Sequence, residues 1–157
     1  RVTLPDGLES LGFYSFADTN IENINFPKSL RHIDDSVFRG TPFLKRIKDD
    51  RFVILGERFL YLYNGYDDTV EVPDGVEVIC SCAFDSREKD KDYYYVTPKK
   101  IILPDSVKQI DGCAFRYQYG LREINLRADM DISATAFDKS GYEESFKAFL
   151  ASKGEKK

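Results

Sequence analysis

The stretch LPDGLESLGFYSF, Leu4 to Phe16, places a proline eleven residues before a phenylalanine. The same interval recurs along the chain, in Pro5 to Phe16, Pro27 to Phe38, Pro73 to Phe84 and Pro104 to Phe115. The distances between these four prolines vary, at 22, 46 and 31 residues. A fixed internal spacing that survives insertions predicts a stack of short structural repeats.

Apolar residues recur at fixed offsets from each proline, three and one residues before it and three and six residues after it. Alternating apolar residues before the proline predict a half-buried strand, and the proline ends that strand because it has no N–H to donate. A second short strand follows, and the phenylalanine closes the interior. We therefore expect two short strands per repeat, few helices and one continuous core. A degenerate fifth copy, INLRADMDISATAF, carries Arg127 where the proline would stand.

Two longer stretches, LPDGLESLGFYSFADTNIENINFP and IILPDSVKQIDGCAFRYQYGLREINL, closely resemble the BspA-type leucine-rich repeat. The resemblance covers about residues 2 to 138. It implies a mainly β fold, a curved right-handed leucine-rich-repeat solenoid. Family members are often secreted or surface proteins of bacteria, and several are adhesins. The resemblance thus implies a non-catalytic module that binds a protein, such as a host or cell-surface protein, or a glycan. The alternative is a structural spacer or stalk that displays another domain.

We assign residues 1–157 to one domain, with repeats at about 2–23, 24–47, 70–100, 101–123 and 124–138. Residues 48–69 form a hairpin-bearing insertion, because RFVILGERFLYLYNG (Arg51 to Gly65) has two apolar runs around a Gly-containing turn. Two interpretations stay open for this hairpin. It is either a decorated structural repeat covered on both faces, or a protruding flap that binds a ligand or dimerises.

The tail SGYEESFKAFLASKG changes to a helical period, and we expect a capping helix at about 141–153. Tyr142, Phe146, Phe149 and Leu150 fall on one helical face. Ser140 and Glu143 fit a capping box, and Gly154 fits a helix stop. The end of a repeat stack needs such a cover over its open core.

Composition limits the possible partners and location. The net charge of −4 argues against nucleic acid as a partner. The sequence contains no run of 18 apolar residues, so no membrane span is predicted. The chain begins at Arg1 inside a repeat, so we expect a trimmed start, and a missing signal peptide is uninformative. The family resemblance favours an extracellular or cell-surface location, with a cytoplasmic one as the alternative.

Tyrosines mark the candidate partner-binding site. Tyr93, Tyr94 and Tyr95 lie in the charged insertion DSREKDKDYYYVTPKK, and Tyr117 and Tyr119 lie at the equivalent corner of the next repeat. Stacking would bring these rings to one edge, where tyrosine is a favoured interface residue. The other interpretation is an edge strand that packs the loop down. A second candidate surface is the outward row of the strands, Thr3, Asn25, Glu71, Ile102 and Asn125.

Catalysis is not expected, since the only histidine, His32, has no partner motif and an enzyme would need a deep polar cleft around it. No cofactor site is recognisable. Cys82 and Cys113 occupy one repeat column, with Cys80 nearby. Simple buried thiols, a Cys82–Cys113 disulfide and a metal site are the three alternatives for these cysteines.

Overall fold

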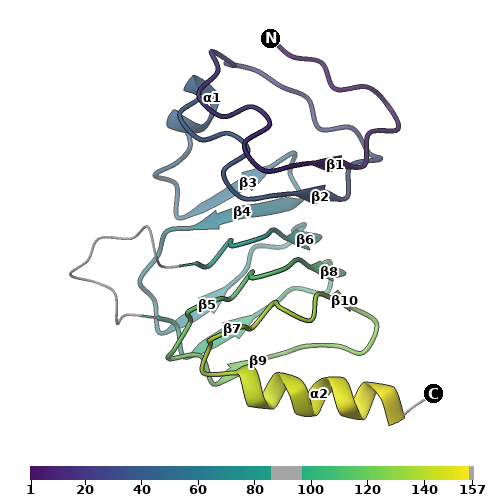
Figure 1. The fold of residues 1–157 in the computed structure, drawn as a ribbon. Coiled ribbons are helices and arrows are strands. Elements are labelled where there is room, and N and C mark those ends of the chain that lie inside the picture. The colour runs from purple at the N-terminus through teal and green to yellow at the C-terminus, as the bar shows by residue number, and fades with distance from the viewer. Residues whose placement is uncertain (86–96, 156–157) are drawn as a thin grey trace.

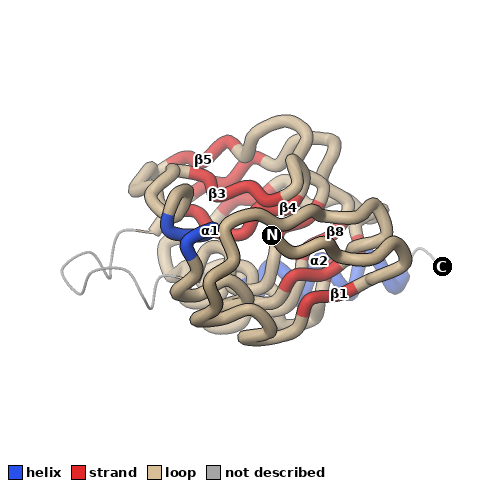
Figure 2. The backbone as a smooth tube through the Cα atoms, turned by 90° about the horizontal axis from the view of Figure 1, so that it is seen from above, coloured by secondary structure: helices blue, strands red, loops and turns tan. Residues whose placement is uncertain are grey.

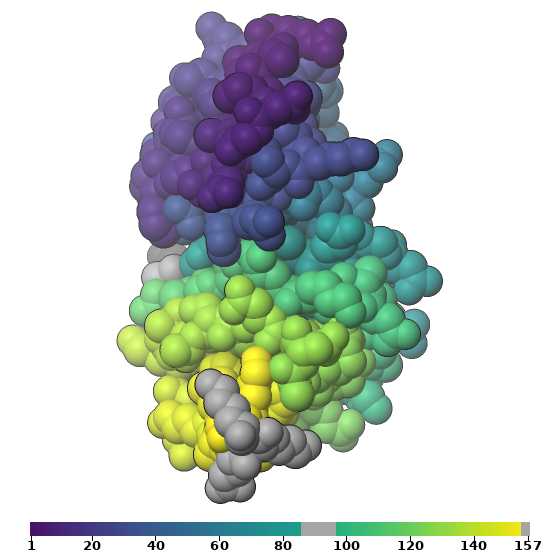
Figure 3. All heavy atoms as spheres, turned by 90° about the vertical axis from the view of Figure 1, so that its right-hand side faces the viewer, coloured from purple at the N-terminus to yellow at the C-terminus, as the bar shows by residue number. Residues whose placement is uncertain are grey.

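The computed structural model describes residues 1–85 and 97–155. Strands of successive repeats lie one beneath another, from the N-terminus at the top of Figure 1 to the C-terminal helix at its base. The bands of colour in the space-filling view follow the same order (Figure 3). The prediction of a mainly β chain with a C-terminal helix is confirmed.

Each proline-containing repeat contributes short strands on two sides of the stack, which Figure 2 shows from above. The strands that follow the prolines are β1 (Ser10–Leu11), β2 (His32–Ile33), β6 (Val78–Ile79) and β8 (Gln109–Ile110), with β10 (Asp131–Ile132) in the degenerate copy. Those that precede them are β5 (Thr69–Glu71), β7 (Lys100–Ile102) and β9 (Glu123–Ile124), and the isolated bridge Val2–Ile24. Equivalent residues pair in parallel, as Ile79 does with Ile110 and Ile101 with Ile124, so the proposed register is confirmed.

The predicted hairpin is present as β3 (Phe52–Leu55) and β4 (Phe59–Tyr63), which pair antiparallel. β4 also pairs in parallel with β6, so the hairpin joins a sheet of order β10-β8-β6-β4-β3. Its side chains are buried on both faces, and the interpretation as a protruding flap is therefore wrong. Apolar residues at nearly every position of both strands leave no face suited to water.

The core consists of two apolar clusters rather than one continuous interior. One surrounds Phe84, Phe115 and Phe137, and the other surrounds Phe38. The pairing register of the hairpin shifts between Val53 and Ile54, which leaves Tyr61 as the extra residue of a β-bulge. A bulge changes which face a side chain points to. Tyr61 consequently packs in the Phe38 cluster, while Tyr63 packs in the Phe84 cluster.

The expected phenylalanine spine is therefore divided and is bridged by these two tyrosines. Ring centroids are 6.1 Å apart for Phe38 and Tyr61, and 4.9 Å apart for Tyr63 and Phe84. Beyond the bridge the stack is regular, with 4.9 Å between Phe84 and Phe115 and 5.0 Å between Phe115 and Phe137. At the other end Phe16 stacks on Phe38 at 6.0 Å and is only half-buried.

Side chains in the turns after the prolines tie one repeat to the next. Ser29 Oγ accepts from the Gly7 N–H and donates to the Leu8 carbonyl, at 3.0 and 2.8 Å. Ser106 Oγ makes the same two bonds between the Pro73 and Pro104 repeats, accepting from the Gly75 N–H and donating to the Val76 carbonyl. These bonds satisfy backbone groups that no strand pairs.

Arginine takes over this role where the repeat departs from the pattern. Arg127, at the missing proline, donates from Nη2 to the carbonyls of Asp105 and Val107, at 3.1 and 2.6 Å. Arg58, in the hairpin turn, donates from Nη2 to the carbonyls of Pro27 and Leu30, at 3.0 and 2.8 Å. A guanidinium presents several donors in one plane, so it can serve two carbonyls at once.

Two helices complete the described part of the chain. The short α1 (Pro42–Lys45) begins at Thr41, whose side chain accepts from the Leu44 N–H. The C-terminal α2 (Glu143–Glu155) places Phe146 in the core, with Tyr142, Phe149 and Leu150 packed around it as expected. Gly154 does not end the helix, and Ser140 Oγ accepts from the Tyr142 N–H at 3.2 Å rather than from Glu143. Lys153 holds the last turn by donating to the Met130 carbonyl at 2.8 Å, so the helix continues past the glycine.

Candidate interaction surface

The corner that follows the second strand of each repeat has an unusual backbone. The residues nine positions after each proline, Tyr14, Ser36, Cys82 and Cys113, all have φ between 58° and 61°. Thirteen positions after the prolines, Asp18, Gly40 and Tyr117 also have positive φ. The left-handed conformation costs an L-residue about 1–2 kcal/mol. The sequence column looked tolerant of many residue types because its side chains lie on this outer corner rather than in the core.

Aromatic rings and cations gather at this corner. The side chain of Tyr14 is 55% exposed, and the Arg39 guanidinium lies over its ring at 5.0 Å from the centroid. Arg116 and Lys139 lie over the Tyr117 ring at 4.9 and 5.5 Å. Each pair is a cation–π contact.

The structure brings together two of the five predicted tyrosines. Tyr117 and Tyr119 have ring centroids 6.1 Å apart, and Tyr119 is 46% exposed. Tyr93, Tyr94 and Tyr95 lie outside the described residues, so the five-tyrosine cluster stays a prediction. Sequence reasoning missed Tyr14 and Arg39. Tyr14 could have been found, because it stands in the same repeat column as Cys82 and Cys113.

A groove with a volume of about 690 Å³ runs along the same corner, where the two core clusters meet. The buried rings of Tyr61 and Tyr63 form part of its floor, and Tyr14, Asp35 and Arg39 stand at its walls. Arg39 pairs with Asp18 at 2.9 Å. Apolar floor and charged walls of both signs suit a polypeptide segment better than a small apolar molecule.

The outward row of strand residues contains two asparagines that hydrogen-bond to the neighbouring repeat. Asn25 accepts from the Leu4 N–H at 2.6 Å and donates to the Leu4 carbonyl at 3.1 Å. Asn125 makes the same pair of bonds with Leu103, at 2.7 and 2.9 Å. These two amides replace missing strand pairing between repeats, and the binding surface expected along this row stays a prediction. A groove of about 510 Å³ is lined by Ile102 and Asn125 of this row, together with Lys100, Glu123 and Tyr142.

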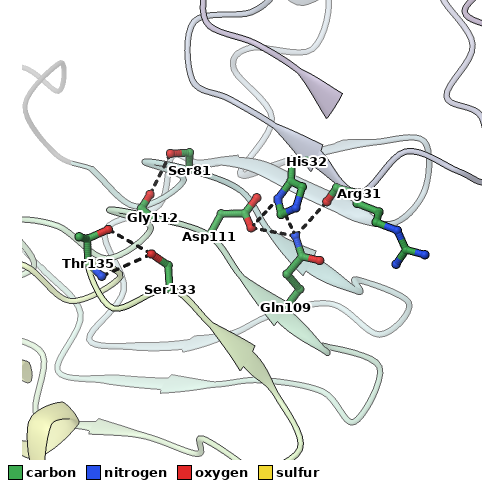
Figure 4. Close-up of polar contacts among 8 residues, drawn as sticks. All are labelled: Arg31, His32, Ser81, Gln109, Asp111, Gly112, Ser133 and Thr135. Carbon is green, nitrogen blue, oxygen red and sulfur yellow. Dashed lines mark hydrogen bonds and ion pairs between the residues drawn. The ribbon is translucent and has the colours of Figure 1, made fainter. Parts of the chain in front are cut away.

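His32 belongs to a polar contact between distant repeats (Figure 4). Its Nδ1 atom is 3.1 Å from Asp111 Oδ1 and 3.1 Å from Gln109 Nε2. Gln109 also donates to Asp111 Oδ1 at 2.8 Å and to the Arg31 carbonyl at 2.9 Å. The His32 side chain is 51% exposed.

Two carboxyl groups near this contact have perturbed acidity. Burial raises the pKa of Asp111 above its usual value, against the hydrogen bond from Gln109 and the nearby His32. Burial, and then the adjacent Asp35, raise the pKa of Asp34. Desolvation of a charged carboxylate explains both directions.

All three cysteines are thiols in this structure. Cys80 is fully buried, and burial raises the pKa of its thiol well above the usual value. Cys82 and Cys113 are only half-buried, so a description of all three as buried thiols is wrong for these two. Within residues 1–85 and 97–155, no group of three His, Cys, Asp or Glu side chains is placed to hold a metal ion. No helix in the same part of the chain is long and apolar enough to cross a bilayer.

Comparison with known proteins identifies the repeat. The profile described as the BspA type leucine rich repeat region matches residues 1–91 and 89–148, with six copies. Comparisons with curated proteins and with solved structures gave no significant match. The chain belongs to the BspA-type leucine-rich repeat family.

Proposed function

We propose that this chain is a non-catalytic protein-binding module of the adhesive kind, built as a curved right-handed solenoid and displayed at the cell surface or outside the cell. The observation that carries the proposal is the corner surface, which we define as Tyr14, Arg39, Tyr117 and Tyr119. The rings of Tyr14 and Tyr119 are exposed, Arg39 lies over the Tyr14 ring, and Arg116 lies over the Tyr117 ring. Tyrosine and arginine are the residue types most enriched among interface hot spots.

The rigidity of the corner surface supports a binding role. Tyr14 and Tyr117 are left-handed residues, and bonds between repeats hold the backbone near them, such as Phe16 N–H to the Val37 carbonyl at 3.1 Å. Backbone strain that persists in a surface position is often associated with function. Side chains that are already ordered lose little entropy when a partner binds.

The spacer alternative predicts aromatic rings packed inward. Tyr14 and Tyr119 are about half exposed, which favours the binding module over the spacer. A protein is also favoured over a glycan as partner, because the 690 Å³ groove beside the corner has an apolar floor and charges of both signs. The family resemblance is the support for the surface location.

A display library of random peptides provides the test. The folded chain should enrich peptide ligands, and the Tyr14→Ala/Tyr119→Ala double variant should bind the selected peptides at least tenfold more weakly. A matched control, Thr3→Ala/Glu71→Ala on the strand face, should bind as the parent does. A glycan array run in parallel separates the two partner classes. Equal binding by both double variants, or enrichment of glycans alone, would contradict the proposal.

A further inference from the structure

Two adjacent repeats place a cysteine at the same corner position. Cys82 and Cys113 stand nine residues after Pro73 and Pro104. Their φ angles are 58° and 59°, so the backbone has the same left-handed conformation at both residues. Equivalent conformations in stacked repeats point the two Cα–Cβ bonds in similar directions, from neighbouring levels of the stack.

Contacts on both sides of the cysteines fix them in register. Before them, Ser81 Oγ donates to the Gly112 carbonyl at 2.8 Å (Figure 4). After them, the Phe84 N–H donates to the Ala114 carbonyl at 2.9 Å. Neighbouring levels of a parallel stack are about 4.8 Å apart. That spacing lies within the Cα–Cα range of about 4.4–6.8 Å that a disulfide requires.

Accessibility separates this pair from the third cysteine. Cys82 lines the corner groove, and both Cys82 and Cys113 are only half-buried. Cys80 is fully buried in the Phe38 cluster. Its thiolate is also scarce, because burial raises its pKa. The thiolate is the species that attacks a disulfide, so an external oxidant selects the two corner thiols.

We propose that Cys82 and Cys113 form a disulfide under oxidising conditions, and that this bond clips the Pro73 repeat to the Pro104 repeat beside the corner groove. The proposal does not depend on the binding function. A low-molecular-weight disulfide such as oxidised glutathione is the oxidant. One protein thiolate attacks it and releases one reduced thiol. The second protein thiolate then attacks the protein sulfur of the mixed disulfide and releases another. Two protein thiols are oxidised, the oxidant's disulfide is reduced to two thiols, and the two protons pass to those thiols.

The disulfide would close a loop that contains all the residues between Cys82 and Cys113. Cross-linking restricts the unfolded chain more than the folded one, so the oxidised protein should be the more stable form. We expect the midpoint of thermal unfolding to rise by about 5–15 °C on oxidation and to return on reduction with dithiothreitol.

The test exposes the folded protein to oxidised glutathione and measures its mass. The parent should lose the mass of two hydrogens, and proteolysis should release one peptide pair joined through Cys82 and Cys113. Cys82→Ser and Cys113→Ser should form no internal disulfide. Serine is a matched replacement because Ser36 occupies the equivalent left-handed position, with φ of 61°. Cys80→Ala is the control and should still form the bond.

A measurement on the parent protein covers the case in which Cys80→Ala fails to fold. After oxidation, Cys80 should be the one cysteine that iodoacetamide labels, and only once the chain is denatured. A bond from Cys80 to either partner would overturn the proposal. So would glutathione adducts on both corner thiols without an internal bond, or a Cys82–Cys113 bond that appears only in denaturant.

Discussion

The imidazole Nδ1 of His32 lies 3.1 Å from Asp111 Oδ1, although 79 positions separate the two residues. His32 is on β2, which pairs with β1 in a two-stranded sheet. Asp111 follows β8, which belongs to the five-stranded sheet of order β10-β8-β6-β4-β3. Phe59 of β4 and Val78 of β6 belong to the same core cluster as Ile33 of β2. The contact therefore links the first two repeats to a sheet in which β2 is not a strand.

Replacing a stacked phenylalanine by alanine should lower the free energy of unfolding by an amount that depends on the burial of its ring. Phe38→Ala or Phe115→Ala removes a fully buried ring with aromatic neighbours, and we expect a loss of about 3–5 kcal/mol in the free energy of unfolding. Phe16→Ala should cost less, since this ring is half-buried at the end of the stack. Urea denaturation measures all three. Similar losses at Phe16 and Phe38 would argue against a half-buried Phe16 at the end of the stack.

The asparagine bridges make a second prediction. Asn125→Ala leaves the N–H and carbonyl of Leu103 without the partners they have in the native chain, so unfolding should become easier by about 1–3 kcal/mol. Asn25→Ala should have a similar effect through Leu4. Asn23→Ala, an exposed asparagine in the same segment, is the control and should change stability by less than about 0.5 kcal/mol in the same urea titration. A neutral Asn125→Ala would contradict the structural role.

The stack was predictable from the sequence because its determinants are periodic. Prolines that end strands and phenylalanines at a fixed offset specify the register, and the hairpin and terminal helix follow from their own apolar periods. The left-handed corner was not predictable, because Tyr14, Ser36, Cys82 and Cys113 stand where glycine would have signalled it.

Two further features depend on tertiary contacts. The bulge at Tyr61 divides the core, yet its residue type fits either side of the hairpin. Asn25 and Asn125 occupy an outward strand position. In the folded chain their side-chain amides hydrogen-bond to the backbone of the neighbouring repeat, which the sequence alone does not reveal. In the candidate site, the sequence located Tyr117 and Tyr119 but not the cations that lie beside the rings.

Acidity near the His32 contact makes a pH prediction. Burial raises the pKa of Asp111, so the folded chain binds this proton more tightly than the unfolded chain does. The resulting stability is fully present below the ordinary carboxyl pKa of about 4 and is lost as pH rises through the higher folded value. Asp111→Asn removes this titration. The free energy of unfolding of the parent, relative to Asp111→Asn, should therefore fall as pH is raised from about 4, measured by urea denaturation at each pH. A parent that gains on the variant as pH rises would contradict the assignment. Asp34→Asn is a companion variant, because burial also raises the pKa of Asp34.

The arginines that replace the regular turn contacts make the last prediction. Arg58→Ala removes the bonds to the Pro27 and Leu30 carbonyls, and Arg127→Ala removes those to Asp105 and Val107. Hydrogen bonds from a charged donor contribute about 1.5–3 kcal/mol, so each variant should lose about 2 kcal/mol of unfolding free energy. Lysine should restore only part of this loss, because one ammonium cannot match the planar geometry of a guanidinium that serves two carbonyls. Arg31→Ala is the matched control, since its side chain is exposed and its carbonyl rather than its guanidinium meets Gln109. Full rescue by lysine, seen in chemical denaturation, would show that charge alone and not the paired carbonyls holds these turns together.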